Sequence, residues 1–276
     1  MSRPKVLVTG ASGLVGGLVL RHLADRYELS ALSRRAVPGV PGVQASVTDL
    51  EAIRPAFRDV DRVLHLAAAT DDDWDWDAQL NVTGIGTVNV LRAAQEAGIR
   101  RVVVMSTGST MLGYEWDEGS PYGLLALGEH DRAGDYALLD ASTPPRPDSP
   151  YGVAKVLAEA AARLFADWYG MSIPVIRLGA VLAEDRPMLV RHFPGWLSQA
   201  DAVQIIDLCL SAPEDLHFEI FDAMSENRAR WRDTTPAKER LGFRPTGSAD
   251  AFDLEALRVP GQTRDPRWPP RDAVSA

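Results

Sequence analysis

A glycine-rich segment directly after the first apolar run constrains this chain more than any other feature. Residues 5–9 are Lys-Val-Leu-Val-Thr, and Gly10, Gly13 and Gly16 follow at three-residue intervals. The arrangement predicts a buried strand, a tight turn and a helix whose N-terminal N–H groups can bind a pyrophosphate. Gly10 would allow the sharp turn, Gly13 the approach of the backbone to the phosphates, and Gly16 close packing of the helix on the sheet.

This segment predicts a nicotinamide dinucleotide site, because a glycine turn after an N-terminal strand is the context that the dinucleotide motif requires. Its spacing is Gly-x-x-Gly-x-x-Gly rather than Gly-x-Gly-x-x-Gly, so a tight turn that binds nothing is the alternative. The cofactor contacts expected in this segment are Gly10, Ser12, Gly13, Leu14, Val15 and Gly16.

Apolar runs and helical periodicity alternate along most of the remaining chain. Strands are predicted over residues 5–9, 28–33, 43–47, 62–68, 101–107, 173–181 and 217–222. Helices are predicted from Gly13, from about Asp49, over 77–97 and over 151–169. The alternation predicts an α/β fold, a Rossmann-type doubly wound parallel sheet of about seven strands with a small C-terminal cap.

The domain organisation expected from this pattern is a single NAD(P)-binding domain over residues 1–258. Substrate-cap segments are expected at about 184–200 and 224–258, where the chain is more polar. Residues 259–276 are rich in proline and arginine, and we expect little regular structure there. Residues 115–150, rich in Gly, Asp and Pro, predict a long functional or lid-like loop.

Composition argues against several classes of partner and chemistry. The formal net charge is -9 and no basic run is present, which argues against a nucleic-acid partner. Cys209 is the single cysteine, so an intramolecular disulfide cannot form, and its apolar neighbours predict a buried helix position. No apolar run approaches ~20 residues and no signal-peptide pattern opens the chain, so a cytoplasmic protein without membrane association is expected. His130 and His192 lack the spacing of metal ligands, and no metal is expected.

The end of the second predicted strand bears on the choice between NAD and NADP. An acidic residue at this point accepts the ribose 2′-hydroxyl of NAD, whereas an arginine accommodates the 2′-phosphate of NADP. Arg34 and Arg35 follow Ser33 here, so NADP is preferred over NAD. Arginines that only face solvent are the alternative. Asp49, after the third strand, could accept from the adenine amino group or serve as the N-cap of its helix.

Tyr151 and Lys155 lie four residues apart near the start of a predicted helix, a spacing that places them on one face. A phenol ordinarily has a pKa of about 10, and a nearby ammonium lowers it. Tyr151 could then take a proton from a hydroxyl group or donate one to a carbonyl. Thr107, at the end of the fifth strand, is expected to hold the substrate oxygen, because ligands bind at that edge of the sheet. A tyrosine and a lysine at this spacing also occur together by chance.

These motifs together resemble those of the extended short-chain dehydrogenase/reductases, the NAD(P)-dependent epimerase/dehydratase family, over roughly residues 5–252. The matching segments are 8–16, 48–50, 65–68, 102–107 and 150–155. The resemblance implies that Thr107, Tyr151 and Lys155 form the catalytic triad and that Lys155 also bonds the nicotinamide ribose. The further cofactor contacts that it implies are Asp49 and Leu50 at the adenine, with Leu66, Ala67 and Ala68 along the cofactor. A homodimer through the helix of Tyr151 is also implied by the resemblance alone.

Within this family the chain is similar to the uronate dehydrogenases in segments 145–152, 196–198 and 240–245. This likeness implies that Thr70 contacts the substrate and that Arg191 binds its carboxylate, a role suited to a bidentate guanidinium. The substrate contacts expected in all are Thr70, Gly108, Ser109 and Arg191.

The chain also departs from the uronate dehydrogenase pattern. Gly108-Ser109 replaces an Asn-His pair, Arg34 replaces an acidic residue and Gln199 replaces a histidine. The loop before Tyr151 is longer, and the family's Asn-Val-x-Gly-Thr pattern is split between the frames of Asn81 and Gly86-Thr87. The fold and the hydride chemistry therefore carry over, but the substrate does not.

Other features of the sequence leave two interpretations open. Residues 71–77 alternate aspartates with Trp74 and Trp76, which predicts a solvated acidic loop or, less favoured, a wall that selects a polyhydroxylated or cationic substrate. Either argues against a highly anionic substrate such as a nucleotide diphosphate sugar. Trp196 and Trp231 could line the substrate pocket or fill the core of the cap.

The sequence thus predicts an NADP-preferring oxidoreductase that acts on a secondary alcohol or ketone of a small molecule, in particular of a sugar or sugar acid. One alternative is a sugar or nucleotide-sugar epimerase or dehydratase that retains its cofactor and recycles the hydride. Another is a non-catalytic NADP-binding sensor or scaffold, against which the intact Thr107, Tyr151 and Lys155 argue.

Overall fold

A computed structural model describes residues 3–70 and 72–258 of the chain. Seven parallel strands form one sheet in the order β3-β2-β1-β4-β5-β6-β7. The strands are β1 (Lys5–Thr9), β2 (Glu28–Ser33), β3 (Gly42–Gln44), β4 (Arg62–His65), β5 (Arg101–Thr107), β6 (Ile173–Leu178) and β7 (Phe218–Ala223). The doubly wound sheet that the sequence predicts is confirmed. The strand order reverses between β1 and β4, and in such sheets ligands bind outside the carboxyl ends of the strands at this point.

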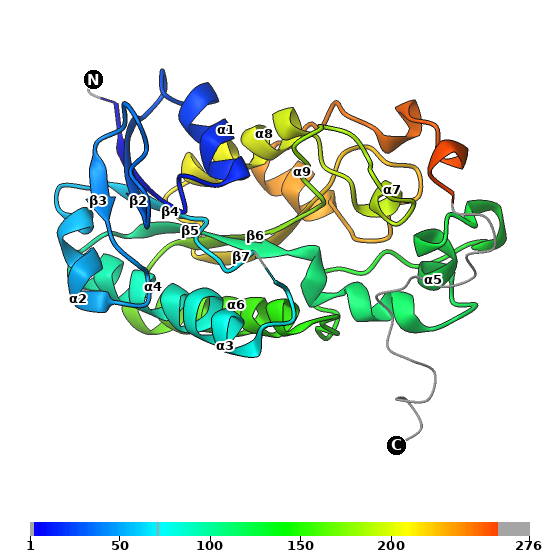
Figure 1. The fold of residues 1–276 in the computed structure, drawn as a ribbon, viewed down its shortest axis with the longest axis horizontal. Helices are drawn as coiled ribbons and strands as arrows, with labels where there is room; N and C mark the ends of the chain where they lie inside the picture. Colours follow the sequence, from blue (N-terminus) through cyan, green and yellow to red (C-terminus); the bar gives the residue numbers. More distant parts are fainter. Residues whose placement is uncertain (1–2, 71, 259–276) are drawn as a thin grey trace.

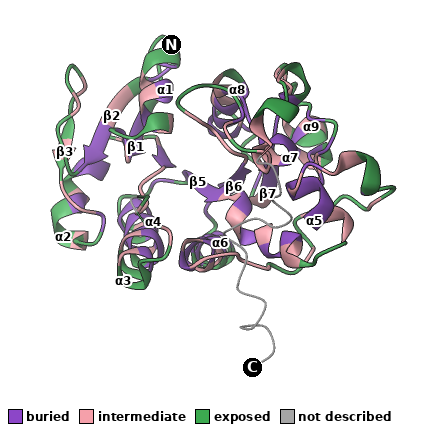
Figure 2. Ribbon diagram, turned by 45° about the vertical axis from the view of Figure 1, so that its right-hand side comes forward, coloured by how far each residue is buried: buried purple, intermediate pink, exposed green. Residues whose placement is uncertain are grey.

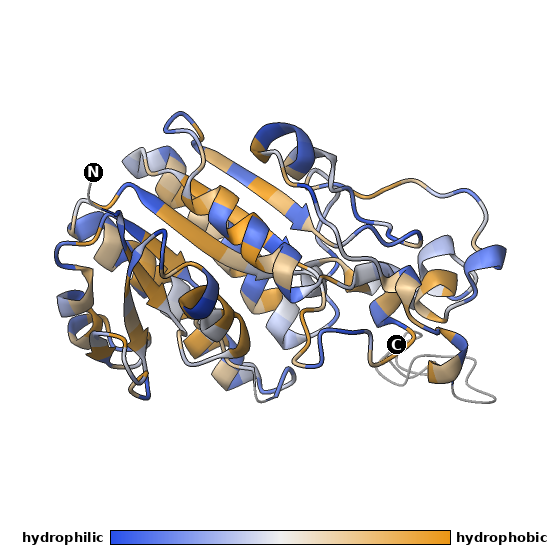
Figure 3. Cartoon of the chain, turned by 90° about the horizontal axis from the view of Figure 1, so that it is seen from above, coloured by the Kyte–Doolittle hydropathy of each residue, from blue (hydrophilic) through white to orange (hydrophobic). Residues whose placement is uncertain are grey.

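Helices cover both faces of the sheet (Figure 1). One face carries α1 (Leu14–His22), α8 (Gln199–Leu210) and α9 (Thr235–Leu241), and the other carries α2 (Leu50–Ile53), α4 (Gly86–Glu96) and α6 (Pro150–Tyr169). Alternate strand residues point to opposite faces. Val6 and Val8 therefore join the core with α1 and α8, whereas Leu7 joins the core with α4 and α6. Figure 2 shows the buried strands between helices with exposed outer faces, and Figure 3 shows the same strands as the apolar centre.

Three strands are shorter than the sequence predicts. β3 is Gly42–Gln44 rather than 43–47, because only these three residues pair with β2 at the edge of the sheet. β4 ends at His65 rather than 68. Leu66 N still donates to the Thr9 carbonyl at 3.2 Å, and the Thr9 hydroxyl then accepts from the N–H of Ala67. β6 ends at Leu178 rather than 181, because Ala180 bridges to Trp196 and the chain leaves the sheet for the cap.

The single helix predicted over 77–97 is three consecutive segments. These are α3 (Trp76–Ala78), a π-helix (η2, Gln79–Ile85) and α4. A Cβ on Gly84 would lie 2.8 Å from Leu157 of α6, and one on Gly86 would lie 2.6 Å from Val47, so glycines allow the close packing of this segment.

Residues 108–150, 184–200 and 224–258 are distant in sequence and together form the cap at the carboxyl edge of the sheet, apart from α9, which packs on the sheet. Residues 115–150, predicted as an irregular loop, contain α5 (Pro121–Ala126), and Leu125 there packs with Met111 and Trp231. The second cap segment contains α7 (His192–Gly195), where Phe193 and Trp196 pack against the third segment.

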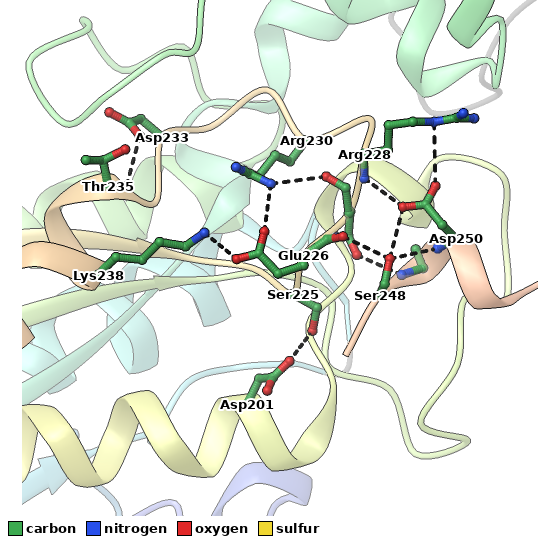
Figure 4. A network of polar contacts seen from close by, with 12 residues as sticks. Asp201, Ser225, Glu226, Arg228, Arg230, Asp233, Thr235, Lys238, Ser248 and Asp250 are labelled. Atoms are coloured by element: carbon green, nitrogen blue, oxygen red, sulfur yellow. Dashed lines mark hydrogen bonds and ion pairs between the residues drawn. The ribbon is translucent and has the colours of Figure 1, made fainter. Parts of the chain in front are cut away.

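A buried carboxylate ties α8 to the third cap segment (Figure 4). Asp201 accepts from Ser225 Oγ at 2.5 Å, from Thr246 N at 2.8 Å and from Gly247 N at 3.0 Å. Beside it, Glu226 pairs with Arg230 and Lys238. These bonds fix the segment that carries the cavity residues described below.

The described part of the chain contains no helix long and apolar enough to cross a membrane. Over the same residues, no group of three or more His, Cys, Asp or Glu side chains could hold a metal. Cys209 is buried in α8, as predicted. The tail predicted over 259–276 lies outside the described residues.

Candidate active site

The glycine-rich turn has a geometry that fits a dinucleotide pyrophosphate. Gly10 has a φ of +68°, and a Cβ there would lie 2.8 Å from the backbone nitrogen of Ala67. A Cβ on Gly16 would lie 2.7 Å from the backbone of Ala11, so α1 packs directly on the turn. Gly13 is the N-cap of α1 and no side chain caps the helix there, which leaves its first N–H groups suited to an anion.

Arg34 and Arg35 follow β2 immediately and are exposed. The Ser33 hydroxyl donates to the carbonyl of Arg35 at 2.5 Å and so is engaged with the backbone of this bend. A hollow between α1 and residues 36–40 borders the glycine turn and is lined by Ser12 and Gly13 among others. Arg34 and Arg35 are accessible but are not among the residues that line this hollow, and the preference for NADP stays a prediction.

The other predicted cofactor contacts gather at the same edge of the sheet. Leu66, Ala67 and Ala68 follow β4, next to the glycine turn. Asp49 is the N-cap of α2, because its Oδ1 accepts from Ala52 N at 3.0 Å, and Leu50 is the first residue of that helix. The structure thus shows the capping role of Asp49, and its contact with adenine stays a prediction.

Thr9 is a residue of this edge that sequence reasoning missed. Its Oγ1 accepts from the backbone nitrogens of Leu66 and Ala67, each at 3.2 Å, and lies 2.7 Å from His65 Nδ1. Burial lowers the pKa of His65 to about 3, so the ring is neutral. The ring also bonds to Thr87 Oγ1 at 2.9 Å, which gives it a structural role. The only indication of this role in the sequence is that a hydroxyl residue, Thr9, ends the first strand.

Thr107, Tyr151 and Lys155 meet at the carboxyl end of β5. α6 begins here because Ser149 caps it, accepting from Gly152 N at 3.2 Å, and Pro150 opens its first turn. The Thr107 side chain lies close enough to Tyr151 to lower the pKa of its phenol. Lys155 is 2% exposed, donates to the Met105 carbonyl at 2.7 Å, and places its Nζ 5.7 Å from the centre of the Tyr151 ring.

The electrostatics of the pair differ from the prediction that Lys155 lowers the pKa of Tyr151. Burial and the negative charge of Asp73 raise the pKa of Tyr151, while the Thr107 side chain opposes them. Burial lowers the pKa of Lys155 to about 8, and the charge of Glu159 opposes that shift. The phenol is therefore protonated at neutral pH in this arrangement, because desolvation outweighs the nearby ammonium.

A cavity of about 190 Å³ lies between the sheet and the cap. Its lining residues are Thr107, Gly108, Ser109, Leu112, Glu115, Leu178, Gly179, Ala180, Arg191, His192, Gly195, Trp231 and Arg232. Gly108, Ser109 and Arg191 thus line the same cavity as Thr107. Thr70 is exposed beyond β4 and is not among the lining residues, so the structure does not bring it to the cavity.

Arg232 and Glu115 are lining residues that sequence reasoning missed, because both come from cap segments without a motif. A Cβ on Gly108 would lie 3.0 Å from the Arg232 guanidinium carbon, so the glycine that departs from the family pattern makes room for this arginine. Trp231 lines the cavity and also packs in the cap core, whereas Trp196 is buried in the core at 5.4 Å from Phe252.

Fold and site together define a dinucleotide-binding α/β protein with a Thr–Tyr–Lys constellation at a small cavity. The chain belongs to the NAD dependent epimerase/dehydratase family, whose model matches residues 6–211. The resemblance to the extended short-chain dehydrogenase/reductases is therefore confirmed.

Individual relatives match over nearly the whole chain. L-arabinose 1-dehydrogenase (NAD(P)(+)) of Haloferax volcanii is 31% identical, over 87% of this chain and 96% of that protein. Uronate dehydrogenase of Pseudomonas putida is 28% identical, over 95% of this chain and 91% of that protein. The crystal structure of uronate dehydrogenase from Agrobacterium tumefaciens has a TM-score of 0.77 at 27% identity, covering 96% of this chain and 92% of that one. The relatives are NAD(P)-dependent dehydrogenases of the extended short-chain type.

Proposed function

We propose that the protein transfers a hydride between NAD(P) and a secondary alcohol or ketone carbon of a sugar or sugar acid. The observation that carries the proposal is that Thr107 lines a small cavity at the carboxyl end of β5, where Lys155 is buried with its Nζ 5.7 Å from the centre of the Tyr151 ring. The names of the relatives, which act on arabinose and uronates, support a sugar substrate. A cavity of about 190 Å³ suits a monosaccharide better than a nucleotide sugar, since ligand sites commonly measure ~300–1,000 Å³.

In the oxidising direction Tyr151 must first release its own proton, and its phenolate Oη then takes the proton of the substrate hydroxyl, while the Thr107 hydroxyl orients the substrate oxygen. Lys155 holds its Nζ 5.7 Å from the centre of the Tyr151 ring, while burial and the carboxylates of Asp73 and Asp148 oppose the phenolate. In the reducing direction Tyr151 donates the proton. When bound, the nicotinamide supplies the hydride chemistry. The residues that would hold the dinucleotide are those of the glycine turn, with Leu66, Ala67 and Ala68.

Replacing Tyr151 with Phe tests the catalytic role. The variant retains the ring but loses the hydroxyl, so we expect kcat to fall at least ~100-fold while cofactor affinity stays within a factor of about two. The assay follows NAD(P)H absorbance with a panel of sugars, uronates and ketones in both directions. Unchanged turnover would contradict the mechanism, and turnover of sugar without net NAD(P)H change would favour the epimerase or dehydratase alternative.

We further propose that NADP is the preferred cofactor, supported by the exposed Arg34 and Arg35 at the end of β2. Arg34→Asp removes a charge-assisted bond to the 2′-phosphate, so NADP affinity should fall about 10- to 100-fold and NAD affinity should hold or rise. Titration of both dinucleotides, monitored by protein fluorescence, measures the change. A preference for NAD in the parent protein would overturn the assignment.

A further inference from the structure

The charged residues of the cavity are paired with one another, and the pairing restricts which sugars can bind. This inference rests on the proposed function. Arg191 Nη2 lies 3.5 Å from Glu115 Oε2, and the two side chains are 9% and 3% exposed. Glu115 belongs to the 3₁₀ helix Leu112–Trp116 (η4), so its carboxylate is a built part of the cavity wall. The guanidinium that would bind a substrate carboxylate thus already has an anionic partner.

The other cation of the cavity wall is neutralised in the same way. Arg232 Nη1 lies 2.7 Å from Asp222 Oδ1 at the end of β7, and both side chains are almost fully buried. His192, which also lines the cavity, accepts from Met188 N through its Nδ1 at 3.3 Å. The two lining arginines are therefore balanced by two buried carboxylates.

Two further carboxyl groups lie beside the reacting tyrosine. The negative charges of Asp73 and Asp148 both act on Tyr151. Burial raises the pKa of each of them, and the charge of Arg191 opposes the shift in both. The charge of Arg191 thus acts on Asp73 and Asp148 in addition to its pairing with Glu115. A substrate carboxylate at Arg191 would add a further negative charge to this group.

We propose that Glu115 is a specificity-determining residue, which makes the cavity select neutral sugars over sugars that carry a carboxylate. Neighbouring hydroxyl groups of a sugar can satisfy both members of the pair, since one hydroxyl donates to Glu115 and the next accepts from Arg191. A uronate must instead bring a second anion to a guanidinium that Glu115 already neutralises, in a buried site where like charges repel strongly. The chain therefore differs in substrate charge from the uronate dehydrogenases that it resembles.

The test compares sugar pairs that differ only at the oxidation level of C6, D-galactose with D-galacturonate and D-glucose with D-glucuronate. For the parent protein, kcat/KM should favour the neutral member of a pair at least about tenfold. Glu115→Gln keeps the shape but removes the negative charge, so it should shift the ratio toward the uronate at least about tenfold, mainly through KM. Glu118→Gln, an exposed position in the same cap segment, is the matched control and should leave the ratio unchanged.

Binding measured without turnover separates the two proposals and serves if Glu115→Gln fails to fold. Calorimetric titration of the four sugars into the NADP-loaded Tyr151→Phe protein should show tighter binding of the neutral sugars. A preference of the parent protein for uronates overturns the role of Glu115 and leaves the proposed function standing. An unchanged ratio in folded Glu115→Gln also overturns that role. If the neutral sugars bind but the parent protein does not oxidise them, only the proposed hydride transfer is contradicted. If none of the four sugars binds, both the proposed function and the role of Glu115 are overturned.

Discussion

Lys155 is required by the proposed chemistry but is costly for the fold. Its ammonium is buried, and its only hydrogen bond described above goes to a backbone carbonyl, that of Met105. Burial lowers its pKa to about 8 from the ordinary lysine value of 10.5. A lysine that is harder to protonate in the folded protein than in the unfolded chain destabilises the fold wherever both states are protonated, which is below about pH 8.

Lys155→Met should therefore stabilise the protein at neutral pH while removing turnover. The difference between the two pKa values corresponds to about 3 kcal/mol, and loss of the bond to Met105 takes back about 1 kcal/mol, so a net gain of about 2 kcal/mol is expected. The gain should shrink between about pH 8 and pH 10.5, where the unfolded chain still binds the proton and the parent fold has released it. Urea unfolding of both proteins across this pH range measures the gain in stability. A gain that does not change with pH would contradict the lowered pKa of Lys155.

At the scale of elements, α6 is held to the sheet by a buried ion pair one turn beyond Lys155. Arg177 of β6 donates Nε and Nη2 to the two oxygens of Glu159, at 2.8 and 2.7 Å. Ser106 of β5 donates to the same carboxylate at 2.6 Å. The pair joins the helix that carries Tyr151 to the two strands that border the cavity.

Arg177→Met should lower the free energy of unfolding by about 3–5 kcal/mol, because Glu159 is left buried without its cation. Arg163→Met is the matched control on α6, since Arg163 forms an exposed pair with Asp167 and its loss should cost under about 1 kcal/mol. The double variant Arg177→Met with Glu159→Met should recover most of the stability. Chemical denaturation measures the free energy of unfolding of each variant. A double variant as unstable as Arg177→Met would show that the unpaired charge of Glu159 is not the cause of the lost stability.

At the same scale, some features of the helices and strands could be predicted from the sequence and others could not. The parallel sheet was predictable because strand and helix periodicities alternate, and the glycine turn was predictable because Gly10 and Gly16 leave no space for a Cβ. The ends of β4 and β6 were not, since the contacts with Thr9 and the Ala180–Trp196 bridge found at these ends join residues far apart in sequence. For the same reason the contacts of Glu115 and Arg232 could not be predicted.

Over the whole molecule, the two predicted binding regions draw on different parts of the chain. The glycine turn and the residues after β4 come from the first quarter of the sequence. The cavity needs residues from β5 through Arg232, held together by cap segments such as the one that Asp201 anchors. Contacts of such long sequence separation form late in folding, because loop closure must precede them.

The three-part cap has a consequence for a chain that is still being synthesised. A nascent chain that has passed β5 already holds the strand, turn and helix suited to a dinucleotide, but the wall that carries Arg232 has not yet left the ribosome. The substrate wall can also diverge separately, because substitutions in segments 108–150, 184–200 and 224–258 leave the glycine turn untouched. The dinucleotide-binding part of the fold can thus stay unchanged in evolution while the sugar specificity of the cavity changes.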